Sequence, residues 1–428
     1  MIKIFIKEDQ NYSKPIGYIL SVFSKNKSLP ISIVKNTTDA RLIFDHNHLA
    51  SLPINTVFFE SLIDKQIYNH EVYFENNPYI LFPDTGKRDY LATAFYLINS
   101  FQEYNAEQNP ESLDKYVRFR FSASLQNKFN CIEKNLVQEC FDQFYLEQSE
   151  LAGLAKPEDR KTKVFLSHDI DSIYGSFFED GMWALQKGRF DIILRLIMNE
   201  VLFRPNWKNM DRIAKLHSAN DLKSTFFWIA TNKVSANGIK NADYSIQKMN
   251  KLTEISKSNG LHKSAYDTSF EEELQLLPFK TKLNRYHYLK FNLPNAWNDL
   301  EDAKLKLDSS LGFAEHCGFR NSYGLPFRPY HIGEQRKFSF VEVPLNMMDR
   351  TLQSYMKIPL EKTATTIIDF IEKNKTNCIL SLLWHNNFFA KYKYGGYLEE
   401  YKKVLQYLHE EKMQSITPEE IINEYAND

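Results

Sequence analysis

The chain has 428 residues, and its 53 basic and 54 acidic residues give a formal net charge of -1. This balance argues against a protein that binds nucleic acid through an excess of positive charge. No uninterrupted apolar run reaches the roughly 20 residues of a membrane span, and we expect no transmembrane segment. The N-terminal stretch MIKIFIKEDQNY lacks the apolar region and the cleavage site of a secretion signal.

The length favours two domains, and the first 150 residues are expected to form a separate α+β unit. MIKIFI, ISIVKN and NTVFFE are short strand-like runs, whereas residues 90–104 and 136–151 have the apolar spacing of helices. DHNH, at residues 45–48, suits a turn better than a metal site. Four cysteines without CxxC spacing indicate reduced, buried thiols and a cytoplasmic protein: Cys131, Cys140, Cys317 and Cys378.

The polar, proline-containing segment 154–163 is the expected domain boundary. We therefore predict an N-terminal α+β domain over residues 1–153 and a second domain over residues 160–428. In this second part KVFL, STFFWIA, FSFVEVPL and NCILSLL are strand-like, and helical runs lie between them. One predicted helix covers residues 245–260 and ends at its glycine. The alternation favours a parallel α/β sheet or barrel.

Two further helices are predicted in the second part. SITPEEIINEY places Thr417 at the N-cap, Pro418 at the first helical position and Glu420 three residues after the cap, which is a capping-box pattern. FDIILRLIMNEVLF, at residues 190–203, is interrupted by charged and polar residues. We expect it to form an amphipathic helix packed on a core, with contact to a membrane surface as the alternative.

SHDID, at residues 167–171, places two carboxylates where the predicted strand KVFL ends. Active sites of α/β sheets and barrels collect at the carboxyl ends of the strands. Residues two apart in an extended segment point to the same side, so Asp169 and Asp171 can face one cleft while Ile170 faces the core. Two carboxylates so close need a metal ion or an arginine beside them. An aspartate-rich cap after a strand is the alternative.

Four later motifs carry titratable groups in a similar setting. They are NGLHKSAYD with His262, RYHYLKF with His287, GFR with Arg320 and LLWHNN with His385. A single histidine is more often a packing or surface residue than a ligand. Aspartate and histidine at three separate strand ends form a more specific pattern than any one of them.

SHDID, GLHKS, GFRNSYGLPF and LLWHNN resemble, in this order, motifs of the polysaccharide deacetylase family, also called carbohydrate esterase family 4 or the NodB-homology domain. The region from RYHYLKF to GFR resembles a bacterial subgroup in which the catalytic domain follows an N-terminal domain. DYLATAFYLINSFQEY and VRFRFSASL are similar to that N-terminal domain, so the resemblance covers most of the chain. It implies a distorted (β/α) barrel and a divalent metal, commonly Zn2+, that activates water for attack on an N-acetyl or O-acetyl group.

The resemblance also implies catalytic roles for four residues. Asp169 would be the general base, and Arg320 would keep it ionised and oriented. His385 would be the general acid that protonates the leaving group, and Asp349 would orient and charge His385. A backbone N–H of residues 321–323 would stabilise the oxyanion.

The implied metal site departs from the family pattern at one position. The usual second motif holds two histidines at i and i+4, whereas here His262 is followed at i+4 by Tyr266. A phenol with a pKa near ~10 is a poor substitute for a neutral imidazole. Asp171, His262 and His287 would supply the three protein ligands that catalytic zinc uses while a fourth position stays open for water. His316 is the competing third ligand.

The sequence thus predicts a cytoplasmic, metal-dependent deacetylase that acts on an acetylated sugar or polysaccharide precursor. One alternative is a catalytically inactive, deacetylase-like protein that binds carbohydrate or serves as a scaffold. The other is a metal-independent glycoside hydrolase with paired carboxylates. The insertion 172–219 is expected to determine the substrate, and Trp228, Trp384 and Tyr323 either bind sugar or fill the core. The sequence determines neither the acetyl linkage nor the oligomeric state.

Overall fold

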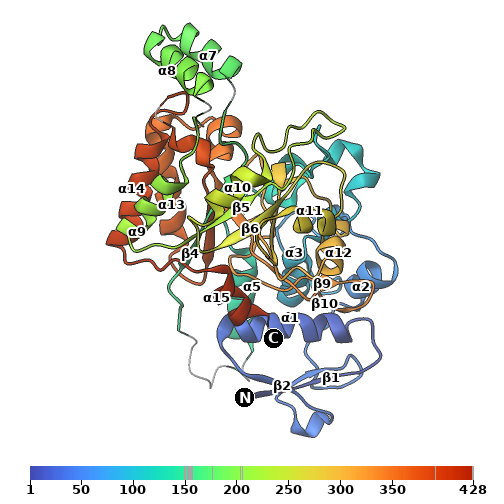
Figure 1. Ribbon diagram of the computed structural model, residues 1–428. Helices are drawn as coiled ribbons and strands as arrows, with labels where there is room; N and C mark the ends of the chain where they lie inside the picture. Colours follow the sequence, from blue (N-terminus) through green and yellow to red (C-terminus); the bar gives the residue numbers. More distant parts are fainter. Residues whose placement is uncertain are drawn as a thin grey trace.

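An eight-stranded parallel sheet forms the centre of the computed structural model, which describes residues 1–148, 151, 158–175, 177–202, 204, 206–390 and 392–426. The strand order is β11-β8-β7-β6-β5-β4-β13-β12. The strands are β4 (Lys163–Ile170), β5 (Ser224–Trp228), β6 (Asn259–Lys263), β7 (Leu283–Tyr286), β8 (Leu307–Asp308), β11 (Val341–Glu342), β12 (Leu345–Met348) and β13 (Ile379–Leu383). The helices of this part are α9 (Met210–Ala219), α10 (Ile246–Thr253), α11 (Phe270–Leu276), α12 (Asn295–Asp302), α13 (Thr363–Lys373), α14 (Tyr397–Glu410) and α15 (Pro418–Tyr425), and they surround the sheet (Figure 1).

The sheet curls so that its two edge strands come close to one another. β11 and β12 lie at opposite ends of the strand order, yet only residues 343–344 separate them in the chain. Leu345 N donates to Leu311 O at 3.0 Å. A Cβ atom on Gly312 would lie 2.4 Å from Leu345 O, so only glycine permits this approach. The result is an open, curled half-barrel, which agrees with the distorted α/β barrel predicted from the sequence.

The strands of this sheet are buried on both faces. Every residue of β13 is buried, and in β4 only the first residue is not. Parallel strands read as continuous apolar runs because helices cover one face and packed side chains fill the other. The predicted capping box of α15 is confirmed, since Thr417 Oγ1 accepts from Glu420 N and Glu420 accepts from Thr417 N.

A second, three-stranded parallel sheet belongs to the N-terminal part. Its order is β2-β1-β3, and its elements are β1 (Ile2–Ile6), α1 (Ser13–Lys27), β2 (Ile31–Ile33), β3 (Leu42–Phe44), α2 (Thr56–Phe59), α3 (Tyr90–Ile98), α4 (Leu125–Lys128) and α5 (Leu136–Glu147). The prediction of a strand at NTVFFE is wrong, because this segment forms α2. The side chain of Asn55 accepts from Phe58 N and so caps the helix.

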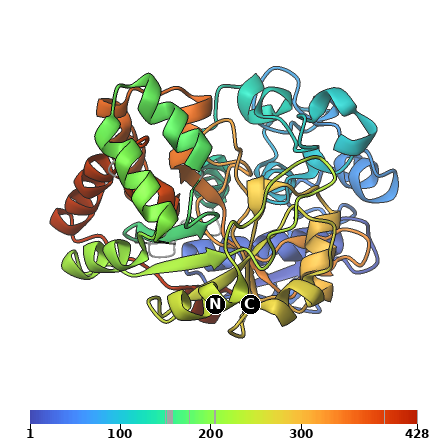
Figure 2. The ribbon, with the colours of Figure 1, turned by 45° about the horizontal axis from the view of Figure 1, so that its top comes forward.

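The N-terminal part packs directly on the barrel. Val137 N donates to Ser322 O at 3.0 Å, and Phe319 N donates to Ile132 O at 2.7 Å. One continuous cluster of buried apolar residues includes members of both parts, and the two termini lie near each other in both views (Figures 1 and 2). The division at residues 153 and 160 stays a prediction, and residues 152–157 of the expected boundary lie outside the described part.

A helical hairpin of α7 (Phe177–Gln186) and α8 (Phe190–Val201) follows β4 and projects from the barrel (Figure 1). The expectation that α8 packs on a core is confirmed for only one narrow face of the helix. Ile192 and Leu196 are buried, whereas Phe190 and Leu194 are exposed. None of the helices in the described part combines the length and the apolar character needed to cross a membrane.

The helix expected over residues 245–260 is shorter than predicted. α10 ends at Thr253, and Gly260 belongs to β6 instead. A Cβ atom on Gly260 would lie 2.5 Å from the ring of Phe227 on the neighbouring strand. This glycine therefore serves the close approach of β5 and β6 rather than a helix end.

Candidate metal centre

Six predicted site residues gather at the carboxyl ends of five strands. Asp169 lies in β4 and Asp171 just after it, His262 lies in β6, His287 follows β7, Asp349 follows β12, and His385 follows β13. The carboxyl ends of parallel strands meet at one edge of a sheet, which is where barrel enzymes carry their sites. The sheet therefore brings together side chains that lie far apart in the sequence.

Asp171, His262 and His287 offer three ligand atoms that lie within 4.8 Å of one another. His262 Nε2 is 3.3 Å from Asp171 Oδ1, and His287 Nε2 is 3.8 Å from Asp171 Oδ2. Both histidines are buried, whereas the side chain of Asp171 is 28% exposed. The cluster is therefore closed by protein on the histidine side and open toward solvent at the aspartate.

Hydrogen bonds fix which nitrogen of each ring faces the cluster. His262 Nδ1 lies 2.9 Å from the carbonyl oxygen of Arg285, which can only accept, so Nδ1 carries the proton. His287 Nδ1 lies 3.0 Å from Asn241 Oδ1, an oxygen that also accepts a backbone N–H. In the neutral form of either ring the Nε2 lone pair is directed at Asp171. Metal-bound histidines are commonly oriented in this way by a bond to the other ring nitrogen.

The charges of the cluster fit a divalent cation. Burial lowers the pKa of His287 to about 3. Burial would raise the pKa of Asp171, but His287 and His262 lower it overall, so the carboxylate is ionised at neutral pH. Burial would also lower the pKa of His262, but the charge of Asp169 raises it overall. The carboxylates thus need a positive charge at this point, and one oxygen with two imidazole nitrogens is a donor set that suits Zn2+.

Arg285 holds the carboxylate of Asp169 in place. Its Nη1 donates to Asp169 Oδ1 at 3.2 Å and to Ser167 Oγ at 2.8 Å, while Nε donates to Ser309 O at 2.8 Å. The other oxygen, Asp169 Oδ2, lies 3.3 Å from His262 Nε2. Asp169 therefore has one oxygen engaged by a fixed guanidinium and one oxygen facing the cluster.

The expectation that Arg320 lies beside Asp169 is wrong. Arg320 Nε donates to Glu103 Oε1 at 2.9 Å, and its Nη1 donates to Gly312 O at 2.8 Å, so it joins the N-terminal part to the barrel. The signal for the correct arginine was present in RYHYLKF. Arg285 and His287 are two residues apart, so a strand that aims His287 at the cleft also aims Arg285 there.

His385 and Asp349 form a tight pair on the other side of the cluster. His385 Nδ1 donates to Asp349 Oδ1 at 2.6 Å, and the His385 backbone N–H donates to Oδ2 at 2.6 Å. Burial would lower the pKa of His385, but Asp349 raises it to about 9. Its Nε2 lies 3.7 Å from Asp171 Oδ2. At neutral pH this ring thus holds a proton on the nitrogen that faces the cluster, as a general acid requires.

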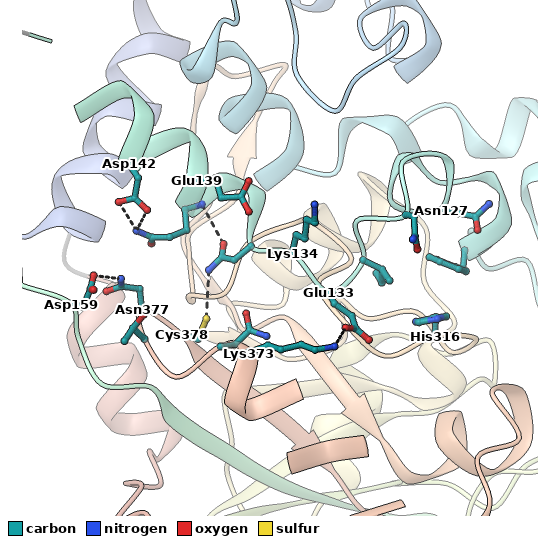
Figure 3. Close-up of a pocket in the computed structure, with 17 residues that line it drawn as sticks. Asn127, Glu133, Lys134, Glu139, Asp142, Asp159, His316, Lys373, Asn377 and Cys378 are labelled. Atoms are coloured by element: carbon teal, nitrogen blue, oxygen red, sulfur yellow. Dashed lines mark hydrogen bonds and ion pairs between the residues drawn. The ribbon is translucent and has the colours of Figure 1, made fainter. Parts of the chain in front are cut away.

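The competing ligand His316 lies elsewhere. Its Nδ1 donates to Cys317 O at 2.7 Å. The residue lines a separate polar cavity of about 930 Å³, shown in Figure 3, together with Glu133, Lys373 and Cys378. Cys378 directly precedes β13, so this cavity borders the amino ends of the strands and not the ends that carry the metal cluster.

Three further expectations concerned the surroundings of the site. Trp228, Trp384 and Tyr323 are at most 2% exposed, so they fill the core rather than bind sugar. The backbone N–H of Ser322, one of the expected oxyanion donors, is already bonded to Phe319 O. Tyr266 is partly exposed in the loop after β6, with Lys233 Nζ 5.0 Å from its ring centre.

Comparison with known proteins gives distant likenesses. A family of unknown function (DUF7033) matches residues 4–149, and no curated protein matches the chain. Each of three solved structures covers 62% of this chain. The "putative polysaccharide deacetylase" of Mycobacterium smegmatis has 10% identity, 96% of its own chain covered and a TM-score of 0.34. The Puue allantoinase has 10% identity, 90% of its own chain covered and a TM-score of 0.39. The 4-alpha-glucanotransferase of Thermococcus litoralis has 9% identity, 40% of its own chain covered and a TM-score of 0.37. At these TM-scores none of the three assigns a family or an activity to this chain.

Proposed function

We propose that the chain is a metal-dependent hydrolase that removes N-acetyl or O-acetyl groups from a sugar or polysaccharide precursor. The observation that carries this proposal is the cluster of Asp171, His262 and His287, flanked by a carboxylate and a protonated histidine. The acetylated sugar is chosen because of the order of the motifs in the sequence. His287 completes the ligand set that Tyr266 left open, so the inactive alternative is not favoured.

A divalent ion held by Asp171, His262 and His287 would lower the pKa of a coordinated water and polarise the substrate carbonyl. Asp169 is placed to accept a proton at Oδ2, because Arg285 engages only Oδ1. The Arg285 guanidinium would hold the Asp169 side chain in this orientation during the proton transfer.

His385 would supply a proton to the leaving amine or alkoxide from Nε2. Its Nδ1–H stays bonded to Asp349, which orients the ring and favours the protonated form. The base and the acid come from the neighbouring strands β4 and β13. Asp169 faces His262 and His385 faces Asp171, so that one residue can take a proton while the other gives one.

The test combines metal analysis with acetate release. The protein is purified without chelator, its zinc content is measured, and acetate release is followed on a panel of N-acetylated and O-acetylated oligosaccharides. Asp169→Asn should keep the zinc and lose roughly 10²- to 10⁴-fold in rate. His287→Ala should lose the zinc. His331→Ala, a partly exposed histidine outside the cluster, serves as the matched control. Wild type without zinc, or acetate release that survives His287→Ala and chelation, would contradict the proposal.

A further inference from the structure

Two tyrosines are exposed at the rim of the metal centre. The chain has 24 tyrosines, all within the described residues, and only Tyr288 and Tyr355 are exposed, at 42% and 39%. Tyr288 directly follows the ligand His287, and the two rings are 4.6 Å apart between centres. Tyr355 ends the short turn that begins two residues after Asp349. The two most exposed tyrosines therefore stand where barrel enzymes admit their substrates.

A third tyrosine reaches the same rim from the N-terminal part. Tyr116 lies in a loop closed by the bridge between Leu113 and Phe119, and its ring centre is 5.4 Å from that of Tyr288. Three chain segments, far apart in the sequence, thus bring partly exposed aromatic rings together.

Arg118 connects the segments that carry Tyr288 and Tyr355. It is 6% exposed, and its Nη1 donates to Tyr288 O at 2.8 Å while Nη2 donates to Tyr355 Oη at 3.1 Å. Its Nε donates to Asp114 Oδ2 at 2.8 Å. A buried arginine with three fixed partners holds the rings in position before any ligand arrives. Such preorganisation lowers the entropy cost of binding.

The backbone at this point also departs from what packing alone would favour. Val117 has φ +63° and Tyr288 has φ +61°. A positive φ is unfavourable for a branched or bulky side chain, and such residues concentrate at functional sites. At Tyr288 the unfavourable conformation accompanies a ring that is 42% exposed, whereas the aromatic rings of the core are buried.

We propose that Tyr116, Tyr288 and Tyr355 bind a pyranose ring of the substrate adjacent to the acetylated sugar. The C–H face of a pyranose is apolar and flat, and tyrosine rings offer it an apolar face with a hydroxyl group at the edge. Lys115 Nζ lies over the Tyr116 ring, 4.9 Å from its centre, and can donate to sugar hydroxyls. The inference rests on the proposed function for its substrate class, and it assigns a role in substrate binding to the N-terminal part.

The experiment separates binding from hydrolysis. Zinc-loaded Asp169→Asn protein, which binds without turnover, is titrated calorimetrically with acetylated glucosamine and xylose oligomers, from the monosaccharide to the hexamer. The site predicts tighter binding of oligomers than of monosaccharides. Adding Tyr116→Ala or Tyr288→Ala should weaken oligomer binding about 3- to 10-fold and leave the monosaccharide affinity and the zinc content unchanged. Tyr116→Phe should retain the oligomer affinity, because the ring face remains.

Tyr407→Ala is the matched control, since Tyr407 is a partly exposed tyrosine on α14 outside this cluster. Equal oligomer affinity in the alanine variants, no gain from monosaccharide to oligomer, or no binding of any glycan would overturn the sugar site. Thermal midpoints identify a variant that unfolds, and Tyr116→Phe then decides. Oligomer binding that depends on the tyrosines without acetate release by wild type would remove the proposed hydrolase activity and keep the sugar site.

Discussion

Replacing Arg320 by methionine tests whether this residue is structural or belongs to the metal centre. Arg320 and Glu103 are each 2% exposed, and the guanidinium also donates to Gly312 O at 2.8 Å. The variant leaves the Glu103 carboxylate buried without a counter-charge. Removing one partner of a buried pair costs about 3–5 kcal/mol. Zinc affinity should not change, because Arg285 and not Arg320 contacts Asp169.

Urea unfolding measures the free energy, and calorimetric titration measures zinc affinity. Replacing both partners, with Arg320→Met and Glu103→Leu together, should recover most of the loss, because an apolar pair of similar volume needs no counter-charge. Arg336→Met is the matched control, since Arg336 pairs with Glu301 at the surface and is 43% exposed. That change should cost less than about 1 kcal/mol. The structural role would be refuted if Arg320→Met lost no more free energy of unfolding than the control, or if its zinc affinity fell.

Three other changes address the pH dependence of stability and the unity of the fold. Burial raises the pKa of Asp308 to about 6 and that of the adjacent Glu342 well above its usual range. Wild-type stability should therefore fall as the pH rises from about 4 through 6, and Glu342→Gln should reduce this fall and raise the thermal midpoint at alkaline pH. Burial lowers the pKa of His217 to about 4. The neutral, buried ring therefore costs no stability above about pH 6.5, and the free energy of unfolding falls as the pH drops from 6.5 through 4. In His217→Gln this part of the fall, roughly 3 kcal/mol, should be absent. Residues 158–428 produced alone should give no cooperative unfolding transition, because the apolar core shared with the N-terminal part would be exposed and Arg320 would lose Glu103. A cooperative transition near the wild-type midpoint would show that the barrel folds independently.

The metal cluster could be predicted because its signals are local. Asp169 and Asp171 obey the two-residue period of a strand, and each histidine lies near the carboxyl end of a strand. The partner of Arg320 could not be predicted in this way. Glu103 lies 217 positions away in the sequence, and no local pattern connects the two. A buried ion pair between distant segments becomes visible only when the packing of those segments is known.

The errors in secondary structure have a similar origin. NTVFFE carries β-prone residues, but the capping bond from Phe58 N to Asn55 starts a helix. Gly260 is predicted to end a helix, but the position requires glycine because the ring of Phe227 on the neighbouring strand leaves no room for a Cβ atom. FSFVEVPL is predicted to be one strand, but it contains β11 and only the first residue of β12, and these two strands form opposite edges of the sheet. At NTVFFE a local capping bond outweighed the strand preference, and in the other two cases a tertiary contact did so.

The contacts between the two parts explain why the barrel needs the N-terminal residues. Residues 309–329 follow β8 and contain no helix, although all of them are described, so this stretch of the sheet lacks the helical cover of a regular (β/α) unit. The N-terminal part supplies that cover: Asn321 Nδ2 donates to Ile98 O at the end of α3, and Ser322 O accepts from Val137 N in α5. A segment that replaces a missing helix of the barrel also reaches the carboxyl ends of its strands, which is why Tyr116 can lie beside Tyr288. Stability and substrate binding are thus both expected to depend on the N-terminal part, but through different residues: variants at Glu103 test stability, and variants at Tyr116 test substrate binding.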